Sequence, residues 1–181
     1  MLGLKRRTVK LSAHDKKWVS AFEREKINLG KIFQKEAVAI EHIGSTSIPD
    51  LLAKPLIDIA VGLGTMKEAR KYIKILEQAG YFYRPNWGRP DQHLLFAKGN
   101  EKRRTHYIHV VKYKGKIWNR DIVFRDYLRK FPKRARGYEK LKTVLAKRYP
   151  DDRPTYTKLK TEFILETVLL AKARKVSKKG D

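Results

Sequence analysis

A short run of glycine and hydroxyl side chains, followed closely by one carboxylate, is the part of this sequence best suited to chemistry. Gly44 precedes Ser45, Thr46 and Ser47, and Asp58 lies in the middle of a later apolar run. Glycine lets a backbone approach a phosphate, and hydroxyls and helix-start amides bind its oxygens. A carboxylate can hold the divalent cation that neutralises phosphate charge. The pattern predicts a phosphate site, with an ordinary strand-to-helix turn as the alternative.

Several cationic side chains are candidates for binding the same phosphate. Lys54 precedes the run that contains Asp58, and it either pairs with a phosphate or favours a helix end. Arg104 has the same two interpretations. Tyr156 and Lys160 are four residues apart, which places them on one face of a helix. Together with Arg153 they predict a helix that closes over an anionic ligand.

Apolar periodicity and turn residues predict the elements that must position these side chains. Helices are expected over about 13–29, 65–79, 118–130, 133–149 and 155–173, with one or two helical turns over 48–53. Strands are expected over about 37–43, 56–61, 81–83, 93–97 and 106–113. The chain is interpreted as one domain, with an α/β core over about 10–115, helices over about 116–174 and a basic tail over 175–181.

The charge of the chain is extreme. Its 181 residues include 43 Lys and Arg against 19 Asp and Glu, a net charge of +24. Such a field predicts nonspecific nucleic-acid binding at low salt, and a basic surface that only serves solubility is the alternative. The chain has no cysteine, so disulfides and thiolate metal sites are excluded. No apolar run approaches the roughly 18 residues of a membrane span, and we expect a cytoplasmic protein without a membrane segment.

Four segments resemble conserved motifs of the GrpB family (glutamate-rich protein GrpB), which is related to the polymerase-β-type nucleotidyltransferases. They are Ile40 to Ile59, Arg104 to Val110, Phe124 to Arg129, and a set from Asp151 to Ile164. The resemblance runs from about residue 8 to about residue 170. It implies an α/β fold of nucleotidyltransferase type, in which a mixed sheet carries flanking helices and a C-terminal helical segment follows.

The resemblance also implies a set of site residues. Asp58 and Glu41 would be the catalytic carboxylates, and Asp58, Glu41 and His109 would hold one divalent cation, Mg²⁺, Mn²⁺ or Zn²⁺. Active polymerase-β-type enzymes usually have a second acid two residues after the first, and Ala60 stands there in this chain. The alternative for His109 is a core histidine bonded to a carboxylate. His106 is expected to face the other side of the sheet.

One position departs from the family pattern. The family usually has glycine after the proline of its Ser-Ile-Pro stretch, and this chain has Asp50. If that glycine has a positive φ, Asp tolerates the conformation better than most residues. If it allows a phosphate to approach, Asp50 adds repulsion.

Three functions remain open from the sequence. The first is a nucleotidyltransferase-like protein that binds a nucleotide or phosphorylated metabolite, with a divalent cation as candidate cofactor for nucleotidyl transfer. The second is a nucleotide- or phosphate-binding module whose catalytic site has decayed, for which Ala60 is the evidence. The third is a basic RNA-binding protein, which the net charge of +24 favours.

Overall fold

The computed structural model describes residues 2–88, 91–100 and 102–177 of the chain. Its strands are β1 (Leu4–Lys5), β2 (Ala37–Ile43), β3 (Ile57–Leu63), β4 (Phe82–Tyr83), β5 (His93–Gly99) and β6 (Arg103–Lys112). Its helices are α1 (Lys17–Phe33), α2 (Lys71–Gln78), α3 (Lys116–Lys130), α4 (Pro132–Arg148), α5 (Arg153–Leu159) and α6 (Thr161–Ser177). Short 3₁₀ turns lie at Gln34–Glu36, Ser45–Ser47 and Pro85–Trp87.

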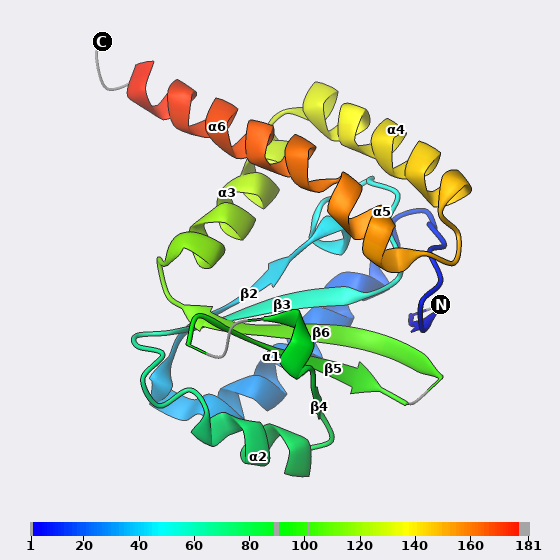
Figure 1. Cartoon of the computed structure of the whole chain (residues 1–181). Helices are drawn as coiled ribbons and strands as arrows, with labels where there is room; N and C mark the ends of the chain where they lie inside the picture. Colours follow the sequence, from blue (N-terminus) through cyan, green and yellow to red (C-terminus); the bar gives the residue numbers. More distant parts are fainter. Residues whose placement is uncertain (1, 89–90, 101, 178–181) are drawn as a thin grey trace.

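The strands form one mixed six-stranded sheet, and helices lie on both of its faces (Figure 1). The strand order is β2-β3-β6-β5-β4, with β1 paired to β6 beyond the end of β3. β3 and β6 are parallel, and the other pairs are antiparallel. The register places Asp58 beside Tyr107 and Ala60 beside His109. The expected α/β fold with a mixed sheet and flanking helices is confirmed.

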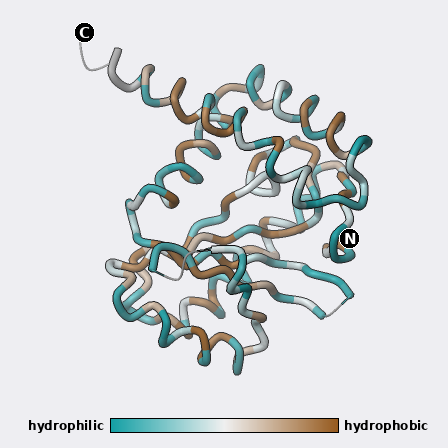
Figure 2. Tube along the Cα trace, in the orientation of Figure 1, coloured by the Kyte–Doolittle hydropathy of each residue, from teal (hydrophilic) through white to brown (hydrophobic). Residues whose placement is uncertain are grey.

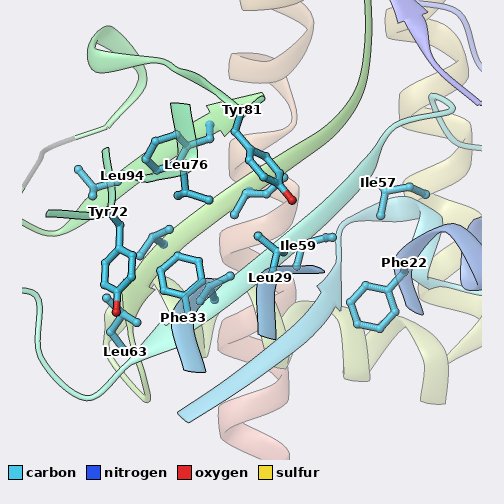
Figure 3. Close-up of a cluster of buried hydrophobic side chains, with 14 of the residues drawn as sticks. Phe22, Leu29, Phe33, Ile57, Ile59, Leu63, Tyr72, Leu76, Tyr81 and Leu94 are labelled. Carbon is cyan, nitrogen blue, oxygen red and sulfur yellow. The ribbon is translucent and has the colours of Figure 1, made fainter. Parts of the chain in front are cut away.

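Alternation along the strands divides the sheet into two faces. One face packs against α1 and α2 in the main core (Figure 3). Its residues are Ile57, Ile59 and Val61 of β3, Leu94 and Phe96 of β5, and Ile108 and Val110 of β6. Figure 2 shows hydrophobic residues along these central strands and hydrophilic ones at the far end of the β5–β6 hairpin. Because side chains alternate, Asp58 and His109 point to the other face, and His106 points toward α1, where Glu25 lies.

The second face is covered by α3 to α6 (Figure 1). Trp118 of α3 packs on Ala60 and Val111, and a side chain at Gly62 would collide with its ring. Phe124, Leu128 and Tyr138 of α3 and α4 form a further cluster with Ile48 and Val168. The helical layer therefore rests on one end of the sheet and leaves space above the other end, where the polar residues lie.

Four predicted helical elements differ from the structure. α2 begins at Lys71 instead of about residue 65, and turns occupy the residues before it. α1 begins at Lys17 instead of about residue 13, because Ser12 pairs its backbone with Ala53. The helical turn expected over 48–53 is absent, and a 3₁₀ turn forms earlier, at Ser45–Ser47. The helix expected over 155–173 is interrupted at Lys160 and forms α5 and α6 instead.

Within the described residues, no helix has both the length and the apolarity that a bilayer span requires. The cytoplasmic location stays a prediction. α6 extends to Ser177, so the first residues of the expected basic tail are helical, and residues 178–181 lie outside the described part of the chain.

Candidate functional site

A cavity of about 300 Å³ lies between the helical layer and the end of the sheet that carries Asp58. Its polar lining residues are Gly44, Ser45, Thr46, Lys54, Asp58, His93, Tyr107, His109, Arg120, Asp121, Tyr138, Lys142, Arg153, Tyr156, Thr157 and Lys160. Trp87 also lines it and is 45% exposed. A wider depression of about 580 Å³ near Met66 and Lys116 contains none of the predicted site residues. The smaller cavity is therefore the candidate site.

Gly44 forms the tight turn at the edge of this cavity. Its φ of 71° and ψ of −175° belong to a region that essentially only glycine occupies. A Cβ atom at this position would lie 2.5 Å from Oδ2 of Asp58. Glycine is therefore required here so that the chain can pass beside the carboxylate of Asp58, whereas the sequence pattern predicted close approach to a phosphate.

The hydroxyl run after Gly44 is mostly occupied by contacts within the protein. Ser47 donates to the carbonyl of Gly44 (2.6 Å), and Thr46 donates to the carbonyl of Leu56 (3.1 Å). The predicted helix N-terminus is wrong, because a single 3₁₀ turn follows Gly44 and its amides bond back into that turn. Ser45 lines the cavity, and its hydroxyl is hydrogen-bonded to Tyr138 and not to the backbone.

Asp58, His109 and His93 form a chain of contacts across the sheet. Nε2 of His109 lies 3.6 Å from Oδ1 of Asp58, and its Nδ1 lies 3.0 Å from Nε2 of His93. Burial, with the nearby His109 and Arg120, lowers the pKa of His93 to about 3, so that ring is neutral. With its proton on Nε2, His93 donates a hydrogen bond to Nδ1 of His109. The Nε2–H of His109 then points toward Asp58.

The same contact chain keeps Asp58 ionised. Burial alone would raise the pKa of Asp58, but His109 and the positive charges of Lys54 and Arg153 lower it below its usual value. One third of the carboxylate side chain (33%) remains exposed to the cavity. Asp58 is thus a hydrogen-bond acceptor on the floor of the cavity.

A cluster of three cations lies opposite Asp58. Nζ of Lys54 and Nζ of Lys160 lie 4.9 Å and 4.5 Å from the centre of the Tyr156 ring. Arg153 donates to the Tyr107 hydroxyl (2.8 Å) and stacks on that ring. Among the described residues, no carboxylate lies within ion-pair distance of these three cations. Their charge is offset only in part by Asp58, which lies farther away.

Burial and mutual repulsion lower the pKa values of the lysines in the cavity. Burial, together with Arg153 and Lys160, lowers the pKa of Lys54 well below its usual value. Burial also lowers the pKa of Lys160 to about 8, with Asp58 opposing the shift and Arg153 adding to it. The pKa of Lys142, which is only 1% exposed, falls to about 7. An anionic ligand would reverse these shifts.

Two predicted site residues and the metal set do not belong to this cavity. The carboxylate of Glu41 pairs with Arg125 (2.7 Å) and is absent from the cavity lining. Arg104 lies toward the other end of β6, where it donates to the carbonyl of Asn100. The proposed Glu41, Asp58 and His109 site is therefore wrong, and no group of three His, Cys, Asp or Glu side chains in the described chain could hold a metal ion.

The remaining donors do not fit the metal chemistry of the polymerase-β type. That chemistry needs two carboxylates on one face of a strand. The second position on that face of β3, two residues after Asp58, is Ala60. Two other possible ligands line the described cavity, but His93 is bonded to His109 and Asp121 pairs with Arg120 (2.7 Å). Asp58 and His109 remain, and these two side chains do not make a two-metal site.

Sequence patterns missed His93 and Lys142, which both line the cavity. His93 is the first residue of β5, on the same face as Leu95, and the strand pairing brings it to His109. Lys142 lies on the apolar face of α4, between Tyr138 and Leu145, and its ammonium donates to the carbonyl of Leu52. A lysine among apolar positions of a helix was the signal that could have identified it.

Asp50, where the family usually has glycine, has a φ of 59°, a conformation that Asp tolerates better than most residues. It lies on the surface outside the cavity.

The chain is a mixed α/β protein with a cavity lined by cationic side chains, and comparisons with known proteins identify its family. The family model described as GrpB protein matches residues 8–169. The glutamate-rich protein GrpB of Alkalihalophilus pseudofirmus is 38% identical over 170 residues, which cover 92% of this chain and 97% of the relative. The UPF0157 protein YqkA of Bacillus subtilis is 35% identical over 88% of this chain and 46% of its own length.

A solved structure agrees with these sequence relatives. The crystal structure of GrpB from Enterococcus faecalis matches with a TM-score of 0.80 and 33% identity, over 90% of this chain and 96% of the other. The chain belongs to the GrpB family. The resemblance that the four sequence motifs suggested is therefore confirmed, and the relation to nucleotidyltransferases stays an expectation with which the fold is compatible.

Proposed function

We propose that this protein binds a phosphate-bearing small molecule, such as a nucleotide or a phosphorylated metabolite, in the cavity between the sheet and α5. The observation that carries the proposal is the cluster of Lys54, Arg153 and Lys160, which has no carboxylate at ion-pair distance in the described chain. Buried like charges are costly unless a counter-charge accompanies them. A phosphate group supplies that charge and offers several acceptor oxygens.

The arrangement supports binding better than metal-assisted nucleotidyl transfer. Asp58 stands alone as a carboxylate beside Ala60, and Glu41 is paired with Arg125. Ser45 at the rim and Asp58 on the floor are placed to accept or donate hydrogen bonds to the uncharged part of the ligand. Of the two small-molecule functions that the sequence left open, the binding module is therefore the one we favour.

Binding should depend on pH through Lys160. A thermal-shift panel of ATP, ADP, UMP, glucose 6-phosphate and pyrophosphate would select the probe, and calorimetry would give its Kd. We expect the Kd to rise about tenfold between pH 7 and pH 9, because Lys160 loses its proton near its pKa of about 8. A phosphomonoester is already a dianion above about pH 6, so its own ionisation would not weaken binding.

The variant Lys160→Arg provides the control for this pH dependence. An arginine keeps its charge throughout this range, so the Kd of the variant should change much less between pH 7 and pH 9. A wild-type Kd that is flat over this range, or no response to any member of the panel, would contradict the proposal.

A second function is favoured by the outer face of α4. The exposed cations Lys133, Arg136, Lys140 and Lys147 follow one another at helical spacing along about 21 Å of this helix. The one acid of α4, Glu139, is turned inward, where it accepts a hydrogen bond from the amide of Leu52. A one-sided basic helix face without acids fits the phosphate backbone of a nucleic acid.

We therefore expect single-stranded RNA to bind α4 weakly and in a salt-dependent way. With four phosphate contacts, a plot of log K against log salt concentration should have a slope of about −3. Fluorescence anisotropy of a labelled oligouridylate between about 50 and 200 mM salt measures this slope. Replacing Lys133, Arg136 and Lys140 with glutamine should weaken binding about tenfold and reduce the slope to about −1.

A matched triple variant on α1 tests whether the location matters. Lys17, Arg24 and Lys31 are also exposed cations, but they lie on the helix that covers the opposite face of the sheet (Figure 1). Their replacement with glutamine should leave RNA affinity nearly unchanged. If both triple variants weaken binding equally, the charge acts as a general field and α4 is not the binding surface.

A further inference from the structure

Lys54 shares with Lys160, and not with Lys142, an amine that has no close polar partner. In the described part of the chain, Nζ of Lys54 has neither a carboxylate within ion-pair distance nor a hydrogen-bond acceptor. Its contact is the Tyr156 ring, over which Lys160 is also placed. Lys142, in contrast, directs its ammonium to the carbonyl of Leu52. Lys54 therefore lines the cavity, and only the Tyr156 ring and the more distant Asp58 offset the charge of its ammonium.

Such surroundings favour the neutral form of the amine. Desolvation, with repulsion from Arg153 and Lys160, makes the ammonium of Lys54 the costly state and lowers its pKa well below the usual value. A neutral amine has a free electron pair and is a nucleophile toward carbonyl carbon, and neighbouring cations are a known means of activating lysine in this way. Lys160 and Arg153 remain available to bind an anion beside it.

We propose that Lys54 forms an imine with a phosphate-bearing aldehyde or ketone, whose phosphate is held by Lys160 and Arg153. The inference rests on the proposed function, since it assumes that a phosphate enters this cavity. It narrows the ligand class from phosphorylated molecules in general to those with a reactive carbonyl group.

The reaction balances without an oxidant or reductant. The electron pair of the Lys54 nitrogen attacks the carbonyl carbon, and the carbonyl π electrons move to oxygen, which takes up a proton. The nitrogen loses a proton to water or to Asp58, which lies in the same cavity. The oxygen of this carbinolamine then takes up a second proton and leaves as water, the nitrogen electron pair forms the carbon–nitrogen double bond, and the nitrogen loses its second proton to water. The sum is amine plus carbonyl giving imine plus water.

Pyridoxal 5′-phosphate is a suitable probe, because it carries both an aldehyde and a phosphate. The whole protein would be treated with less than one equivalent, reduced with borohydride, and mapped by peptide mass spectrometry. We expect most of the adduct on Lys54, and a labelling rate at least tenfold above that of pyridoxal, which lacks the phosphate. The rate on Lys54 should reach its plateau at a lower pH than the rate on exposed lysines.

Two variants and one further probe distinguish failure of this inference from failure of the proposed function. Lys54→Arg keeps a cation but cannot form an imine, so the adduct should be lost, whereas Lys140→Arg on the surface should label normally. Adducts spread over surface lysines, or placed on Lys160, would overturn the inference. Pyridoxine 5′-phosphate has no carbonyl: if it binds the wild-type protein and no adduct forms on Lys54, this inference fails and the proposed function stands. If it does not bind and Lys54 is not labelled, both fail.

Discussion

Replacing Gly44 with alanine is expected to lower the free energy of unfolding by about 2–5 kcal/mol. Two costs add at this position. The backbone has a φ of 71° with an extended ψ, which strains any residue with a Cβ atom by about 1–3 kcal/mol. The new methyl group would also lie 2.5 Å from Oδ2 of Asp58, so the carboxylate must move or the turn must open. Urea denaturation followed by circular dichroism measures the loss.

Gly30→Ala is the matched control for this change. Gly30 lies inside α1, and a Cβ atom there would meet nothing within 4 Å. The same substitution should therefore stabilise the protein by about 0.5–1 kcal/mol, because alanine is the better helix former. If Gly44→Ala proved as stable as the wild type, the turn would have to adopt another conformation, and the close approach to Asp58 would not hold in solution.

Replacing Arg153 with glutamine is expected to weaken the binding of a phosphate-bearing probe about 10- to 100-fold. The reason is the loss of one charge-assisted hydrogen bond to the anion, which contributes about 1.5–3 kcal/mol. The fold should survive, because the start of α5 is capped by Asp152, whose carboxylate accepts the amide of Thr155 (3.1 Å). Calorimetry with the best probe of the nucleotide and sugar phosphate panel gives the affinity.

The melting temperature of the unliganded Arg153→Gln variant is a second readout, and it should not fall as the affinity does. Removing one of three neighbouring cations relieves repulsion on Lys54 and Lys160, so the melting temperature should stay the same or rise. Arg148→Gln, an exposed arginine at the end of α4, should change neither quantity. A variant that lost stability and kept its ligand affinity would identify Arg153 as a structural residue.

Local patterns determined the order of the elements and the face that each strand residue presents. Ile57, Asp58 and Ile59 alternate along β3, and strand geometry turns the acid away from the apolar core that the two isoleucines enter. Tyr156 and Lys160, four residues apart, do share the cavity. The GrpB motifs also identified the family before any contact was known.

Tertiary structure decided which side chains become partners. The sequence motifs predict that Glu41 joins Asp58 and His109, yet its carboxylate pairs with Arg125 of α3. His93 and His109 meet because β5 and β6 pair in one particular register. Lys54 joins Arg153 and Lys160 only when α5 packs over the sheet. Periodicity depends on the backbone within one element, whereas partner choice depends on how elements distant in the chain pack, and a charge balance across a cavity exists only after they have done so.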